Sequence, residues 1–185
     1  EYNAVRFSVE IDDFLANKNT EGLPLGLQRL MSKTLDQFCD HENEWRAYTR
    51  WFARLPLFLE GEAFRVVHAC WDATMIAQYR RQYSVDHLPE EFITASKQPD
   101  SFEGCMVDRL TRGTSLPLPE GMKIESKDGF IRHFFRTKFW AKSPKTYGDV
   151  IFQPDPIPFD LHANTIHNHH KNNLVNYPVD AVPFL

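Results

Sequence analysis

The sequence predicts a mixed α/β fold of the α+β type, and three observations support this class. Apolar residues recur at helical spacing in one region, a strand–turn–helix pattern follows it, and a later segment alternates between two faces like a strand. Hydrophobic residues make up 42% of the 185 residues and charged residues 25%, which is enough apolar material for a real core. We therefore expect a folded globular chain and exclude a disordered one.

Two helices are predicted over about 26–39 and 42–54, where apolar residues recur at steps of three and four. Asp40 is placed to cap the second helix, and Pro56 to end it. A weaker pattern of the same kind predicts a third helix over about 86–110.

Between these helices the spacing predicts two strands, over 57–59 and 64–67, joined by a turn at 60–62. Val66 and Val67 are apolar at consecutive positions, so we expect the second strand to be buried on both faces. His68 stands at the carboxyl end of that strand, and Asp72 is placed to cap a helix that carries Met75, Ile76 and Tyr79.

Residues 130–140 alternate, which predicts a strand with one core face and one face of cationic and aromatic side chains. Residues 147–152 are expected to be its antiparallel partner, and Asp128-Gly129 is typical of a hairpin turn. Beyond Gln153 the chain is rich in Pro and Asn, so we expect a loop as far as residues 179–185.

Composition narrows the function classes. The net charge of −4 excludes a generally cationic nucleic-acid binder, and 8 glycines in 185 residues argue against a glycine-rich phosphate loop. No apolar run approaches the roughly 20 residues of a membrane helix and the amino end lacks a signal-peptide pattern, so no membrane partner is expected. Three cysteines at unrelated spacings predict reduced thiols in a cytoplasmic protein.

His68 is the strongest single candidate for chemistry. Side chains at the carboxyl ends of strands project into the crevice where ligands gather, and a neutral imidazole is a good ligand for a transition metal. The alternative is a core histidine that makes one backbone hydrogen bond. Position alone favours the core histidine.

A second candidate is the histidine-rich run of His162, His167, His169 and His170. Such runs bind zinc where three or four ligands converge from a rigid frame. This run is interspersed with Asn and follows a proline-rich stretch, so a solvated surface loop is the favoured interpretation.

The third candidate is the segment 123–145, where seven Lys or Arg stand against two acidic residues for a local charge of +5. Such a patch steers a phosphate-bearing substrate, although a charged strand face is more often simply the solvated side of a sheet. The aromatic residues of 130–140 have a superficial likeness to an RNA-recognition strand, but the glycine spacing does not match. A non-catalytic module that binds RNA or a protein partner through 130–140 stays open as the alternative function, while nucleic acid is not the expected partner.

A family resemblance bears on His68. The stretch Leu55-Pro56-Leu57-Phe58-Leu59-Glu60, followed by Arg65-Val66-Val67-His68-Ala69-Cys70-Trp71-Asp72, resembles the middle of the calcineurin-like metallophosphoesterases. This superfamily includes serine/threonine protein phosphatases and diadenosine tetraphosphate hydrolases. The resemblance implies that His68 is a metal ligand and that the chain belongs to a sheet sandwich flanked by helices.

Both ends of the chain extend the resemblance. Glu1-Tyr2-Asn3-Ala4 resembles the residues directly after G-N-H in the family, and Val182-Pro183-Phe184-Leu185 resembles the strand before a late G-H motif. The D-x-H, G-D-x-x-D, G-N-H and G-H motifs are themselves missing. The resemblance thus implies an interior segment with no catalytic residue of its own, which we expect to be inactive alone.

For the intact protein the resemblance implies a hydrolase of phosphoester or phosphoanhydride bonds that uses two divalent ions (Mn, Fe, Zn or Mg) to activate hydroxide. Its substrate would be a phosphorylated small molecule, nucleotide or phosphoprotein. Residues 1–83 would form the core with the metal-ligand strand, 84–145 a helical and hairpin cap, and 146–185 the return to the core. Arg132 and Arg136 are the candidates for substrate binding, and the residues expected near the site are Glu1, Asn3, Cys70, Trp71 and Asp72.

Overall fold

The computed structural model describes residues 2–18, 23–83, 87–125, 129, 131–152, 157 and 159–175. These residues combine helices with short antiparallel strands, which confirms the mixed class. The chain divides into two compact units, Glu1–Leu57 with Tyr83–Cys105, and Phe58–Gln82 with Met106–Leu185. Both units are built from separate stretches of sequence, and the cap assigned to 84–145 stays a prediction.

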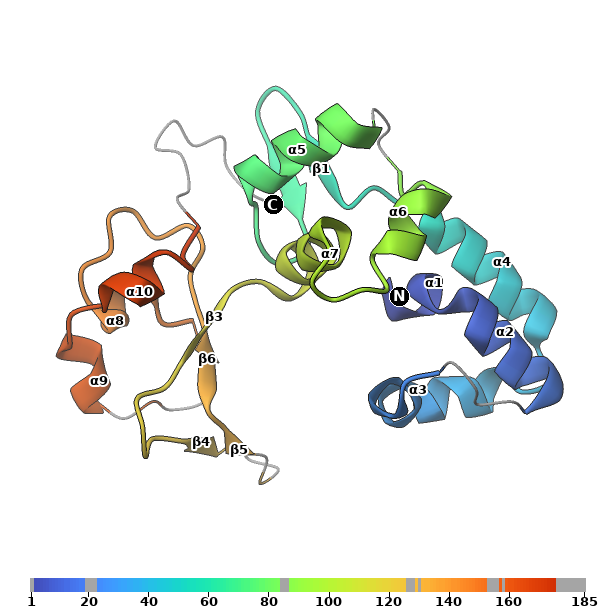
Figure 1. Cartoon of the computed structure of the whole chain (residues 1–185), viewed down its shortest axis with the longest axis horizontal. Helices are drawn as coiled ribbons and strands as arrows, with labels where there is room; N and C mark the ends of the chain where they lie inside the picture. The colour runs from blue at the N-terminus through green and yellow to red at the C-terminus, as the bar shows by residue number, and fades with distance from the viewer. Residues whose placement is uncertain are drawn as a thin grey trace. The chain divides into compact units, whose positions relative to one another are not determined.

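The first unit is helical (Figure 1). It contains α1 (Tyr2–Arg6), α2 (Ser8–Asn17), α3 (Leu25–Phe38), α4 (Glu42–Ala53) and α6 (Glu90–Ala95). Helices α3 and α4 confirm the two predicted from periodicity, whereas α1 and α2 had no sequence prediction. Their apolar faces meet in a core made of Ala4, Ile11, Leu15, Leu23, Leu27, Leu35 and Trp45.

Polar contacts hold α6 in this unit. A guanidinium nitrogen of Arg6 donates to the carbonyl oxygen of Ser96, and Lys97 Nζ lies 2.6 Å from Glu10 Oε1. The helix predicted over 86–110 is wrong, because the chain forms α6 and α7 (Phe102–Arg112) with turns between them. Pro99 lies between the two helices, where it removes a backbone donor and disfavours helical backbone at the preceding residue.

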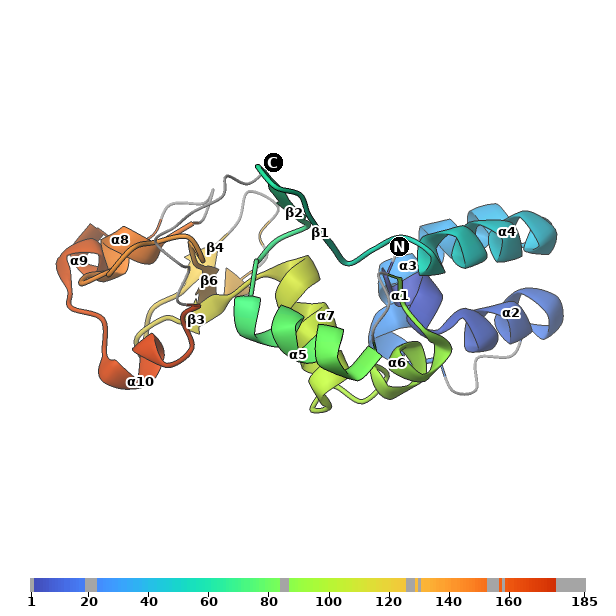
Figure 2. The ribbon, with the colours of Figure 1, turned by 90° about the horizontal axis from the view of Figure 1, so that it is seen from above.

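In the second unit, β1 (Phe58–Glu60) and β2 (Arg65–Val67) form the predicted hairpin, with Phe58 opposite Val67. Figure 2 shows the hairpin leading into α5 (Ala73–Tyr83). Val66 and Val67 are half-buried, not buried on both faces as predicted, because the described residues supply this sheet with two strands.

Glu60 ties this hairpin to α5. Its two carboxylate oxygens accept hydrogen bonds from Arg80 and Arg65, each at 2.8 Å. These two bonds, the one from Arg80 foremost, lower the pKa of Glu60. Arg80 also lies over the ring of Phe58 and Arg65 over the ring of Trp71, so both cations have structural roles.

Four further strands form two pairs. β3 (Ser115–Pro117) pairs with β6 (Phe134–Arg136), and β4 (Ile124–Glu125) pairs with β5 (Ile131–Arg132), both antiparallel. The single strand predicted over 130–140 is therefore wrong, because a bend at His133 divides it. The predicted alternation holds after the bend: Phe135 is buried, and Phe134 and Arg136 on either side of it are exposed.

Residues 147–152 are not the predicted strand. Tyr147–Val150 form a short helix, α8, because Thr146 and Asp149 make a capping box around its first turn. Hydrogen bonds from the backbone amides of Thr146 and Lys145 hold the pKa of Asp149 below its usual range. Strand-like pairing is found at the end of this segment: Ile151 bridges Thr137, the Phe152 amide donates to the Arg136 carbonyl, and the Lys138 amide donates to the Val150 carbonyl.

The loop predicted beyond Gln153 contains two short helices, α9 (Phe159–Ala163) and α10 (Asn168–Lys171). Figure 1 shows them with α8 beside β3 and β6. The core of this part consists of Leu116, Leu118, Ile124, Phe135, Tyr147, Val150, Leu161 and Ile166. The turn at Asp128 and the apolar stretch 179–185 fall outside the described residues.

Phe135 and Phe134 offer a matched test of this core. Phe135 is 0% exposed and its neighbour in β6, Phe134, is 50% exposed. Phe135→Ala is expected to lower the free energy of unfolding by about 3–5 kcal/mol, because it leaves a cavity among tightly packed side chains. Phe134→Ala is expected to change it by less than about 0.5 kcal/mol. Urea unfolding followed by circular dichroism measures both values, and equal losses would contradict the alternation.

Candidate functional site

His68 lies directly after β2, as predicted, in a bend that is held by hydrogen bonds from the next two residues. The backbone amides of Ala69 and Cys70 both donate to the carbonyl oxygen of Leu110 in α7, at 2.9 and 3.4 Å. The His68 side chain is exposed, so it is not the buried core histidine that position alone favoured. Within the described part of the chain, neither ring nitrogen makes a hydrogen bond or ion pair.

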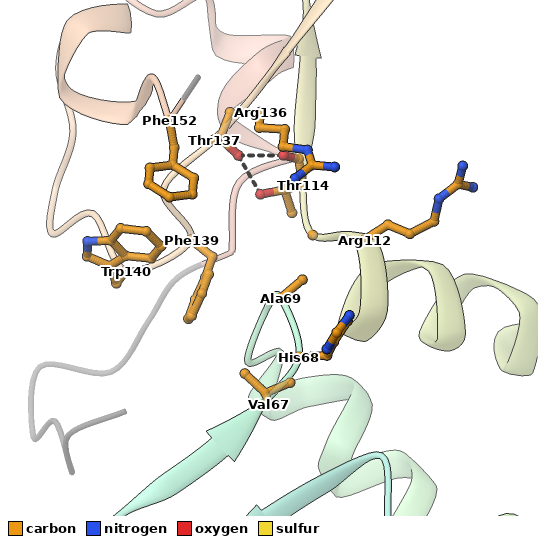
Figure 3. Close-up of a pocket in the computed structure, with 11 residues that line it drawn as sticks. Val67, His68, Ala69, Arg112, Thr114, Arg136, Thr137, Phe139, Trp140 and Phe152 are labelled. Atoms are coloured by element: carbon orange, nitrogen blue, oxygen red, sulfur yellow. Dashed lines mark hydrogen bonds between the residues drawn. The ribbon is translucent and has the colours of Figure 1, made fainter. Parts of the chain in front are cut away.

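The bend at His68 lines a pocket of about 530 Å³ in the second unit (Figure 3). The other lining residues come from the end of α7 and the link to β3, from the end of β6 and the residues that follow it, and from the segment after α8. The complete set is Val67, His68, Ala69, Arg112, Gly113, Thr114, Arg136, Thr137, Phe139, Trp140 and Phe152.

Two cationic side chains line this pocket. Arg112 and Arg136 line it, and no acidic side chain is among its described lining residues. Arg112 makes an ion pair with Asp108 at 2.8 Å, between two exposed side chains one helical turn apart. Such exposed pairs are worth about 0–1 kcal/mol, so an anion in the pocket can compete for Arg112.

Two threonines join the strands at the pocket. The Thr137 hydroxyl contacts the Thr114 hydroxyl, and it also donates to the Thr114 carbonyl oxygen at 3.2 Å (Figure 3). Both side chains are buried, so these contacts satisfy polar groups that would otherwise lack a partner. The two residues fix the end of β6 against the chain that leaves α7.

Of the two arginines predicted to bind substrate, the structure brings one to His68. Arg136 lines the same pocket, whereas Arg132 lies in β5 and is not among the lining residues. Arg112 was missed by the sequence analysis. The helix-ending pair Arg112-Gly113 is a readable signal for a basic residue at a helix end, but it does not show that this end meets His68.

The residues that follow His68 have structural roles, in core packing and in capping α5. Cys70 and Trp71 are buried, and Trp71 makes an edge contact with Phe58, with 5.9 Å between ring centroids. Asp72 Oδ1 accepts hydrogen bonds from the amides of Thr74 and Met75, which confirms Asp72 as the cap of α5. Asn3 lies in α1 of the other unit, and Glu1 is outside the described residues.

Metal ligands do not cluster in the described residues. Across the described ranges, no group of three or more His, Cys, Asp or Glu side chains could hold a metal ion. His68 thus fits the role of one ligand, with an accessible imidazole on a fixed bend, but the described residues supply no complete metal centre.

The histidine-rich run is more ordered than the surface loop that was favoured from sequence. His170 is buried in α10, and its Nδ1 lies 2.8 Å from the Tyr147 hydroxyl. The rings of His167 and His169 stack with 5.6 Å between centroids. Burial lowers the pKa of His170, and the neighbouring His169 and His167 lower it further.

The comparisons with known proteins add no relative. No family model, no curated protein and no solved structure matches this chain. Among the described helices none is both long and apolar enough to cross a membrane.

The cysteines provide a test of the turn after His68. Burial raises the pKa of Cys70 to about 12, while Cys105 is exposed. Because the thiolate is the reactive form, Cys70 is expected to resist a disulfide reagent such as DTNB at about pH 8 until the chain unfolds. Cys105→Ser should remove a rapidly reacting thiol, and Cys70→Ser should remove none. Rapid labelling of Cys70 in the folded chain would contradict this packing.

The lowered pKa of His170 predicts that the stability of the chain depends on pH. Its pKa in the folded chain lies below the ordinary value of 6.5, so the unfolded chain binds a proton first as the pH falls. The free energy of unfolding should therefore be fully retained above about pH 7 and decrease as the pH falls through 6.5 toward the lowered folded value. His170→Gln should reduce this decrease, whereas His133→Gln, at an exposed position, should preserve it. Chemical unfolding at a series of pH values measures both, and an identical pH dependence in His170→Gln would exclude this role.

Proposed function

We propose that the chain is a segment of a metal-dependent phosphoesterase, in which the pocket beside His68 receives the phosphate group of the substrate. The observation that carries the proposal is one juxtaposition: an accessible histidine at a strand end shares a pocket with Arg112 and Arg136. The sequence around His68 resembles the metallophosphoesterases, which adds the reaction class. The resemblance makes the intact protein a hydrolase of phosphoester or phosphoanhydride bonds.

His68 would hold one of the two divalent ions (Mn, Fe, Zn or Mg). When bound, such ions activate a hydroxide and polarise phosphate oxygens. The remaining ligands are expected in parts of the intact protein beyond the described residues, since these contain no further ligand cluster. This chain alone is therefore expected to bind a phosphate-bearing molecule but not to hydrolyse it.

The described residues contribute binding and orientation. Arg112 and Arg136 attract the phosphate, and a guanidinium matches two phosphate oxygens at once. The hydrogen bonds from Ala69 and Cys70 to Leu110 fix the backbone of the bend that carries His68, so its Cα keeps one position relative to α7. The three cysteines are free, which fits the proposed cytoplasmic location.

The alternative, a module that binds RNA or a protein partner through 130–140, has one observation in its favour. Phe134 and Trp140 are both exposed in this segment. However, the bend at His133 leaves Phe134–Arg136 as the strand that pairs with β3 in a two-stranded sheet, whereas RNA-recognition modules stack bases on a four-stranded sheet. The phosphoesterase proposal also accounts for His68, which the alternative leaves without a role.

His68→Ala tests the proposal in the intact protein. With Mn²⁺ and an aryl phosphate as substrate, the variant should lose about tenfold or more of the activity, because loss of a residue that merely orients a metal ligand already costs about 10–100-fold. Bound manganese, measured by elemental analysis, should fall as well. His133→Ala changes an exposed histidine that is not among the pocket residues and is the matched control. Full activity and full metal content in His68→Ala would overturn the assignment.

A further inference from the structure

One side of the pocket is an aromatic wall made of Phe139, Trp140 and Phe152. The ring centroids of Phe139 and Trp140 are 5.0 Å apart and those of Trp140 and Phe152 are 5.2 Å apart, both in edge-to-face geometry. In Figure 3 the three rings lie together on one side of the pocket and Arg136 and Arg112 lie on the other, with the Arg112 side chain extended away from the rings. Metal binding by His68 gives no reason for three adjoining rings.

Backbone pairing holds the wall in place. The Phe152 amide donates to the Arg136 carbonyl at 2.9 Å, and the Lys138 amide donates to the Val150 carbonyl at 2.7 Å. Both bonds flank the bridge between Thr137 and Ile151. The rings therefore stand on two chain segments that are fixed to one another on both sides of the bridge.

The rings of the aromatic wall differ in their exposure to solvent. Phe139 is 7% exposed, whereas Trp140 is 40% and Phe152 is 53% exposed. Large aromatic side chains that remain accessible inside a pocket provide flat apolar surface for a second ring system. The same pocket supplies cations, so a ligand that fits it has an anionic end and a flat aromatic end.

We propose that this pocket selects nucleotides, whose base stacks on Trp140 and Phe152 while the phosphate faces Arg136 and Arg112. The inference deepens the proposed function and rests on it for the placement of the phosphate. Every base presents a flat π-face, so stacking on these rings recognises the class of nucleotides without choosing one base. The chemistry distinguishes nucleotides from sugar phosphates, which lack the ring, and from nucleosides, which lack the charge.

Calorimetric titration of the metal-free chain tests the inference. AMP is expected to bind about 5- to 150-fold more tightly than ribose 5-phosphate, the range that stacking of one base provides. Adenosine should also bind more weakly than AMP, because it does not engage the arginines. Equal affinity for AMP and ribose 5-phosphate would overturn the inference, and so would tight binding of an oligonucleotide with no measurable binding of AMP.

Variants of the aromatic wall test whether its rings cause the preference for AMP. Trp140→Ala and Phe152→Ala should each reduce the preference for AMP over ribose 5-phosphate, with the affinity for ribose 5-phosphate unchanged within about twofold. Trp51→Ala is the matched control, because Trp51 is also an exposed tryptophan in an aromatic pair but lies in α4 of the other unit. Thermal unfolding of each variant separates a lost stack from a lost fold. An undiminished preference in both Trp140→Ala and Phe152→Ala would exclude the wall.

The two proposals fail separately. Binding by the metal-free chain requires no hydrolysis, so an inactive intact protein would leave the nucleotide preference standing. Conversely, an intact protein that hydrolyses ribose 5-phosphate as well as AMP, and loses that activity in His68→Ala, would sustain the phosphoesterase and refute the nucleotide pocket.

Discussion

The carbonyl group of Leu110 organises the candidate site. It accepts hydrogen bonds from Ala69 and Cys70, so the bend that carries His68 is fixed to the last turns of α7. Gly113 then ends that helix with a φ of +86°, and a Cβ there would lie 3.7 Å from Ala69 Cβ, so the helix end and the bend lie against each other. The chain continues through Thr114 into β3. Arg112, Thr114 and His68 thus share one pocket because a single helix end meets a single bend.

The ion pairs of the arginines differ in how strongly they hold each side chain. Glu60 accepts hydrogen bonds from both Arg65 and Arg80, and these guanidinium groups also cover the rings of Trp71 and Phe58, so both are committed to the hairpin and α5. Arg112 is held only by an exposed pair with Asp108, which contributes little and is screened by salt. An anion at Arg112 therefore replaces a weak interaction, whereas an anion at Arg65 would have to break a structural one. In the proposed phosphate site, Arg112 is therefore a cation that an anion can engage at low cost.

Local signals in the sequence were sufficient for α3, α4, the β1–β2 hairpin and the position of His68 at a strand end. They failed where a local feature outweighed a longer pattern: Pro99 interrupts the helix predicted over 86–110, the bend at His133 divides the strand, and the Thr146–Asp149 capping box starts a helix in place of its partner. The pocket itself could not be predicted, since the residues whose contacts bring Arg112 to His68 are far apart in sequence: Ala69 and Cys70 on one side and Leu110 on the other. The residue pattern was enough to predict the mixed fold class and to propose Arg136 as a site residue. The aromatic wall could not be predicted, because Phe152 joins it through its backbone hydrogen bond to Arg136.

Strand register couples the core to the pocket. Phe135 packs in the core opposite Leu116, and the next residue, Arg136, lines the pocket. Because side chains alternate along a strand, a slip of one residue would place Arg136 in the core and Phe135 in solvent. Burying a guanidinium among apolar side chains is far more costly than burying a phenyl ring, so the register that completes the core is also the one that presents the cation. The same register pairs Thr137 with Thr114, and it thereby determines the position of Phe139 and Trp140, which follow Thr137 in the chain. The hydrophobic core thus determines the positions of Arg136 and of the aromatic wall together. A ligand that contacts both the arginine and the rings would bind to an arrangement that is already formed when the chain folds.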